Sequence, residues 1–159
     1  MVAKDRNAGN LGRFETTITV PQLDPEKPGV SSLVLADLVE KIPMKDIASG
    51  PFAIGESRVR PRVTGVFKPS EKLWIFLKAY RLPGSVVQYG LFREGSGERI
   101  ASFLDNLSQT GAVPVAQATV EKELNLGTLA PGRYTVRATM LNAGQIPIFA
   151  PVEPDFRIQ

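Results

Sequence analysis

The chain has 159 residues, of which 43% are hydrophobic and 22% charged, an ordinary globular composition that is long enough to bury one hydrophobic core. Cysteine and histidine are both absent, which excludes disulfides, zinc–thiolate sites and every catalytic group that relies on imidazole or a thiolate. The formal net charge is only +3, and the basic residues are scattered rather than massed. We therefore expect a non-enzymatic protein without metal or cofactor and without a nucleic-acid partner. No stretch approaches the roughly 18 consecutive apolar residues that span a bilayer, so we expect no membrane insertion.

The first ten residues are polar and mixed in charge, which predicts a flexible leader over 1–10 and one domain over 11–159. The strand candidates that follow mostly alternate apolar and polar side chains, as strands with one buried face do. In chain order they are 13–20, 31–38, 58–67, 71–82, 85–93, 99–104, 113–126, 133–140, 146–150 and 156–159. Between them, residues 39–55 give a poor signal, and Pro43 and Pro51 limit them to an irregular connection with at most one short helix.

The strand predicted over 71–82 is apolar on both faces. Leu73, Ile75, Leu77 and Ala79 share one face, and aromatic residues populate the other. This pattern predicts a central strand, with one face against the opposite sheet and the other under a cover such as residues 39–55. The Pro83-Gly84 dipeptide that follows predicts a tight turn that pairs this strand with 85–93.

A second pattern identifies the fold class. Pro131-Gly132 marks a turn, and Tyr134 then opens an alternating run. In immunoglobulin-like sandwiches a tyrosine at this point sends its hydroxyl to a backbone group a few residues upstream and locks the corner. Together with about eight strands joined by short turns, this predicts an all-β, antiparallel immunoglobulin-like or fibronectin-III-like β-sandwich.

The order of these features resembles the C-terminal β-sandwich segment of acidobacterial GWxTD and von Willebrand A-related proteins. The matching pieces are 14–20, 31–36, 73–80, the 126–136 stretch with its Leu-x-Pro-Gly-x-Tyr core, and the terminal Phe156. The Gly-Trp-x-Thr-Asp string and the Asp-x-Ser-x-Ser string that define those families are absent. The resemblance implies an accessory domain of a larger, exported bacterial protein, located in the periplasm or at the cell surface, and it transfers no functional residues.

Three arginines form the most conspicuous charged pattern. Arg58, Arg60 and Arg62 alternate, so in an extended segment they point to one side with a spacing of roughly 7 Å. They could bind phosphates or sulfated sugars. The alternative is a solvated edge strand whose charges discourage aggregation, and we favour it because phosphate recognition normally recruits more donors.

Aromatic residues form the other candidate site. Trp74, Phe76 and Tyr80 could provide a platform on which sugar rings stack, although the only tryptophan of a central strand in such sandwiches is usually part of the core. Glu121 and Glu123 share a strand face, whereas glycosidase carboxylates oppose each other across a cleft, so we interpret them as solubilising charges.

We therefore predict a non-catalytic immunoglobulin-like accessory module that acts in protein–protein contact or as a structural spacer. Its partner would be another protein or another domain of the parent chain, and an edge strand such as 58–67 could support a weak dimer. The alternative function is a carbohydrate-binding module that uses an exposed aromatic strand face.

Overall fold

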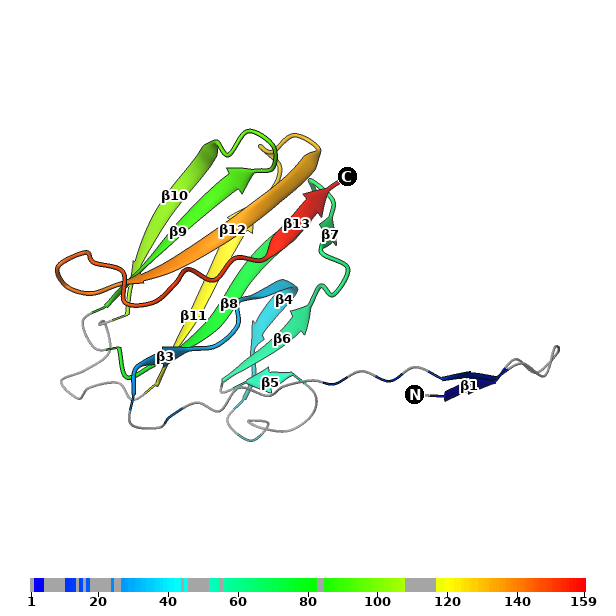
Figure 1. Ribbon diagram of the computed structural model, residues 1–159, viewed down its shortest axis with the longest axis horizontal. Coiled ribbons are helices and arrows are strands. Elements are labelled where there is room, and N and C mark those ends of the chain that lie inside the picture. The colour runs from blue at the N-terminus through cyan, green and yellow to red at the C-terminus, as the bar shows by residue number, and fades with distance from the viewer. Residues whose placement is uncertain are drawn as a thin grey trace.

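The computed structural model describes residues 2–4, 11–13, 15, 17, 24, 27–43, 45, 52–54, 56–82, 85–107 and 117–159. This part of the chain is an all-β sandwich in which a five-stranded and a six-stranded sheet pack against each other (Figure 1), so the predicted fold class is confirmed. Strands β4, β6 and β8 to β13, eight in all, have four or more residues. Within the described ranges, no helix is long and apolar enough to cross a membrane.

The five-stranded sheet has the order β10-β9-β12-β13-β7. Its strands are β10 (Arg99–Asn106), β9 (Val86–Arg93), β12 (Gly132–Leu141), β13 (Asp155–Ile158) and β7 (Val66–Phe67). Neighbours in this sheet pair antiparallel except for β13 and β7, which are parallel. The strand predicted over the last residues of the chain is thus β13, which lies between β12 and β7.

The six-stranded sheet has the order β11-β8-β4-β6-β5, with β3 also paired to β8. Its strands are β11 (Gln117–Asn125), β8 (Lys72–Tyr80), β4 (Val34–Lys41), β6 (Ser57–Pro61), β5 (Ala53–Ile54) and β3 (Gly29–Val30). A separate hairpin, β1 (Val2–Lys4) with β2 (Leu11–Arg13), falls within and just after the predicted leader, and Figure 1 shows it apart from the sandwich. Most of the strand predicted over 13–20 lies outside the described residues.

The core lies between the sheets and follows the alternation of the sequence. The inward face of β8 meets inward faces of β9 and β12, and each fully buried large apolar side chain contributes about 1.5–3 kcal/mol. The fully or nearly fully buried members include Phe67, Leu73, Ile75, Leu77, Val87, Tyr89, Leu126, Tyr134, Val136, Phe156 and Ile158.

The predicted pairing of 71–82 with 85–93 is wrong. Strand β8 pairs along its whole length with β11, whereas β9 pairs with β10 and β12 in the other sheet. The connection after β8 is therefore a crossing between the two sheets, and Arg81 begins it in a left-handed backbone conformation with φ of 50°. Both strands carry a strongly apolar face, and these faces bury each other across the sandwich rather than side by side. Pro83 and Gly84 themselves lie outside the described residues.

The single edge strand predicted over 58–67 is wrong. Its first part belongs to β6, which lies between β4 and β5, and its end is β7 in the other sheet, because the chain crosses between the sheets after Pro61. Other strand boundaries also differ from the prediction. Residues 39–41 continue β4 instead of starting an irregular connection, and Asp105 and Asn106 continue β10. The strand predicted over 146–150 is reduced to an isolated bridge between Leu141 and Pro147. Residues 44 and 46–51, where a short helix was conceivable, lie outside the described residues.

The tyrosine corner is confirmed. Tyr134 is buried, its hydroxyl donates a hydrogen bond of 2.6 Å to the carbonyl oxygen of Ala130, and its ring stacks on Phe156 with centroids 5.5 Å apart. The corner opens β12, which follows β11 from the opposite sheet, as strand F follows strand E in immunoglobulin-like domains. Strands β8 and β11 lie in one sheet, and β9, β12 and β13 lie in the other. Strands B and E lie opposite strands C, F and G in the same way in immunoglobulin-like domains.

Replacing Tyr134 with phenylalanine tests the corner. The substitution keeps the ring and removes the hydroxyl, leaving the Ala130 carbonyl without its side-chain partner, so we expect a loss of about 1 kcal/mol in the free energy of unfolding. Denaturant unfolding measures it. Tyr80→Phe is the matched control because the Tyr80 hydroxyl bonds to none of the described residues, and equal losses in both variants would contradict the role of the corner.

Candidate functional site

The outer face of β8 is covered by its own sheet. Strand β4 pairs with β8 through Val34, Leu35 and Ala36. It pairs with β6 from Ala36 onward, and the β4–β6 register shifts in a bulge between Ala36 and Leu38. Bulges bend a strand and increase its twist, and beyond this one β4 pairs with β6 alone. We call the second half of β4 with β5 and β6 the flap.

A hydrogen bond shows how far the flap curls. The Ser57 hydroxyl of β6 donates to the carboxylate of Glu121 on β11. In a flat sheet these two strands would lie three strand spacings apart, about 14 Å. The direct side-chain contact therefore requires the sheet to curl over the outer face of β8.

This curling creates a second apolar cluster and determines the environment of the aromatic candidates. Val59 of the flap packs with Ala36 and Phe76, and Val34, Val39, Ile54 and Trp74 surround them. Phe76 is only 2% exposed and has no free face on which a sugar ring could stack. Trp74 lies half-buried at the border of the cluster, and Tyr80 lies half-buried where β3 joins β8.

Trp74 is the only tryptophan, so its fluorescence reports the state of the flap. Val59→Asp places a charge inside the cluster, and because an unpaired buried charge is strongly unfavourable, we expect the flap to open. The emission of Trp74 should then shift to the red and its quenching by iodide should increase. Val63→Asp is the matched control because Val63 is 94% exposed. Identical emission from both variants would show that the cluster does not cover Trp74.

The Ser57 network resembles a serine–lysine pair, but its geometry is structural. Lys41 donates to the Ser57 hydroxyl at 3.0 Å and also forms an ion pair with Glu121 at 3.1 Å. Ser57 is buried, with 1% of its surface exposed, so no substrate can reach its hydroxyl. The network ties the flap to β11 and offers no nucleophile.

Carboxylates neutralise the three alternating arginines. Arg58 pairs with Glu40 at 3.3 Å, and Arg60 pairs with Asp37 at 2.5 Å. Arg62 lies between Asp37 at 3.4 Å and Glu71 at 2.6 Å. Each guanidinium thus already has an anionic partner, and the bulge residue Asp37 serves two of them.

Glu71 is the carboxylate that pairs with Arg62, the last of the three arginines. The backbone N–H of Lys68 donates to its carboxylate at 2.7 Å, and the Arg62 guanidinium adds a second bond. These two hydrogen bonds, the backbone one first, hold the pKa of Glu71 below its usual value of 4.5.

A lowered carboxyl pKa stabilises the fold above pH 4.5, and this contribution is lost as the pH falls through the native-state pKa. In Glu71→Gln the contribution is missing at every pH. We therefore expect the difference in free energy of unfolding between wild type and variant to be constant near neutrality and to shrink in acid. Denaturant unfolding from about pH 3 to 7 measures it. A difference independent of pH would contradict the pKa shift.

The side of the sandwich formed by the edge strands β10 and β11 is open. A groove of about 320 Å³ runs between them and has an apolar floor. Its lining residues are Leu91, Ile100, Ala101, Phe103, Lys122, Glu123, Leu124, Asn125, Thr128 and Leu129. A groove at the small end of the range for ligand sites suits inserted side chains better than a cofactor.

Lys122 bridges the two sides of this groove. Its ammonium group lies 3.1 Å from the Asp105 carboxylate and 5.9 Å from the centre of the Phe103 ring. Behind it, burial and then the nearby Asp105 raise the pKa of Tyr89 above its usual value of 10, so this phenol stays protonated and cannot act as a base. Within the described part of the chain, no three acidic residues come together to hold a metal ion.

The two candidate carboxylates do not act as a pair. Glu121 bonds Ser57 and Lys41, and Glu123 pairs with Lys72 at 3.0 Å. The chain matches no protein-family model and no curated protein, so its function has to be argued from the geometry alone.

Sequence reasoning missed the groove. Its residues come from strands and a turn that are separated in sequence, such as Phe103 and Leu129, and no local motif joins them. One signal was present: the segment from Ile100 to Leu104, within a predicted strand, has no charged residue.

Proposed function

We propose that this chain is a non-catalytic immunoglobulin-like accessory module of a larger, exported bacterial protein, and that it acts by protein–protein contact along β10. The resemblance to the accessory segments of GWxTD and von Willebrand A-related proteins supports the first part. The observation that carries the second part is the edge of β10, which pairs with no strand beyond β9 among the described residues, beside the open groove.

The strands at the sheet edges differ in how they are protected. β5 and β7 have only two residues each, and β11 carries the charged run Glu121–Glu123. Short and charged edges resist pairing with other chains. In contrast, β10 has eight residues, and the five between Arg99 and Asp105 are uncharged. Ile100 and Leu104 on this strand are 40% and 57% exposed.

These features fit an extended polypeptide segment that adds to β10 as a further strand. The free backbone groups of an edge strand provide affinity, and alternate side chains of the added strand provide specificity. Side chains on its inner face would enter the groove beside Phe103, and those on its outer face would cover Leu104. The partner is therefore expected to present an uncharged, alternating strand-forming segment.

Site-specific photocrosslinking in the intact parent protein tests this proposal. A photoreactive amino acid in place of Leu104 should crosslink to a partner at alternate residues of one extended segment, as mapped by mass spectrometry. The same group at Thr119, an exposed residue of β11, should give no such pattern. Ile100→Lys should abolish the crosslinks from position 104 because a charge on the edge opposes strand addition.

The mapped peptides identify the occupant. Peptides of another protein or domain would support the proposal, whereas β10 itself as the crosslinked segment would indicate a second copy of this chain. Crosslinks that are equal at positions 104 and 119, or insensitive to Ile100→Lys, would overturn it.

A further inference from the structure

The outer face of the β12–β13 pair follows a pattern that breaks at one position. Thr135 lies opposite Asp155 and donates to its carboxylate at 2.6 Å. Arg137, one step further along, pairs with Glu153 at 2.5 Å. On the same face, two residues before Thr135, Arg133 lies directly opposite Arg157, so two cations face each other.

The opposition of Arg133 and Arg157 has an energetic cost. Directly opposed side chains in an antiparallel pair have Cβ atoms about 4.5–5.5 Å apart, and like charges there destabilise the sheet. The nearest counter-charge to Arg133 is Glu94 at 3.7 Å, and both side chains are more than half exposed, so this ion pair is weak. Arg157 forms no ion pair with the residues that the structure describes.

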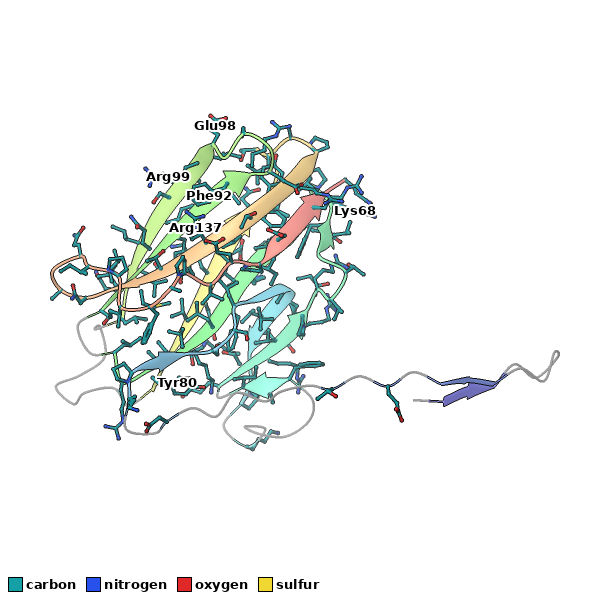
Figure 2. All side chains as sticks on the ribbon, in the orientation of Figure 1. Lys68, Tyr80, Phe92, Glu98, Arg99 and Arg137 are labelled. Atoms are coloured by element: carbon teal, nitrogen blue, oxygen red, sulfur yellow. The ribbon has the colours of Figure 1, made fainter. Side chains whose placement is uncertain are left out.

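Arg137, on the same face, has a partner on each side of its guanidinium. The ring of Phe92 lies over Gly90, where an added Cβ would be 2.6 Å from a ring carbon, and the Arg137 guanidinium stacks on that ring at 4.6 Å (Figure 2). With Glu153 on its other side, Arg137 is occupied. Arg133 and Arg157 have no comparable arrangement.

The two opposed arginines line an open hollow of about 560 Å³. Its lining residues are Pro131, Gly132, Arg133, Arg157, Ile158 and Gln159. The guanidinium of Arg93 lies beside it, 3.8 Å from where a Cβ on Gly132 would stand. Lys68 follows β7 at the same end of β13 (Figure 2). Four cations therefore gather around this space, where Glu94 pairs weakly with Arg133 and Glu71 lies near Lys68.

We propose that this hollow binds a tetrahedral oxyanion, the phosphate or sulfate group of a larger ligand, between Arg133 and Arg157. A guanidinium presents a planar fork that matches two oxygens of an anion. One guanidinium can donate to both oxygens of a carboxylate. The three or four oxygens of a tetrahedral oxyanion can accept hydrogen bonds from two guanidinium groups. The anion would also remove the repulsion between the two cations. This site is separate from β10, because β9 lies between β10 and the β12–β13 pair.

The first test is an NMR titration of the isotope-labelled chain with sodium sulfate and with inorganic phosphate, at ionic strength held constant with sodium chloride. We expect saturable shifts at Arg133, Arg157 and Gly132, and weaker binding of acetate. Arg157→Gln should lower the affinity about tenfold or more, through lost charge-assisted hydrogen bonds. Arg137→Gln is the matched control and should leave the affinity unchanged.

Thermal unfolding provides a second measurement that also checks folding. Sulfate should raise the Tm of wild type and of Arg137→Gln by mass action, and should not raise that of Arg157→Gln. Without sulfate, Arg157→Gln should be at least as stable as wild type because the opposed charges are gone. Comparing O-phosphoserine with glucose 6-sulfate then distinguishes a phosphorylated from a sulfated source. Shifts that do not saturate, or equal losses in Arg137→Gln and Arg157→Gln, would overturn the proposal.

Discussion

The apolar character of both faces of β8 is the constraint on which the rest of the structure depends. The face with Leu73, Ile75 and Leu77 is buried against the opposite sheet, which any sandwich can provide. The face with Trp74 and Phe76 needs a second cover, because exposing it would leave large apolar surface in water. The bulge after Ala36 meets this need by turning β4 away from β8 and carrying β6 over Phe76. The ion pairs of the arginines outside the flap and the Ser57–Glu121 hydrogen bond beneath it hold the flap closed.

Covering one face of the sheet determines which surfaces remain for contact. The flap covers the aromatic strand face, and carboxylates pair with Arg58, Arg60 and Arg62. What remains is the β10 edge with its groove, where backbone groups and apolar side chains are both accessible, and the arginine-lined hollow at the end of β13. The first suits a polypeptide and the second an oxyanion. Both sites are built largely from paired strands, so an interaction there would need little ordering of the module itself.

Local patterns predicted the features that depend on a few neighbouring residues. The Pro-Gly-x-Tyr turn predicted the corner at Tyr134, and the alternation in β8 predicted a strand covered on both sides. Periodicity says which face of a strand is buried but not in which sheet the strand lies, so the 71–82 and 85–93 runs were wrongly paired. The bulge at Asp37 was hidden because the segment from Leu33 to Leu38 resembles an uninterrupted strand. The groove and the Arg133–Arg157 opposition depend on tertiary packing and strand register, which a single sequence does not specify.

Residue-resolved amide hydrogen exchange of the isolated chain tests the central claim most directly, namely that β8 is covered on both faces while the β10 edge is open. Amides of β8 should exchange slowest, and those of β6 should be protected because the flap is closed. Alternate amides of β10, which do not bond to β9, should exchange as fast as exposed turns. Rapid exchange throughout β6 would show that the flap is not closed, and protection of every amide along β10 would show that its edge is covered.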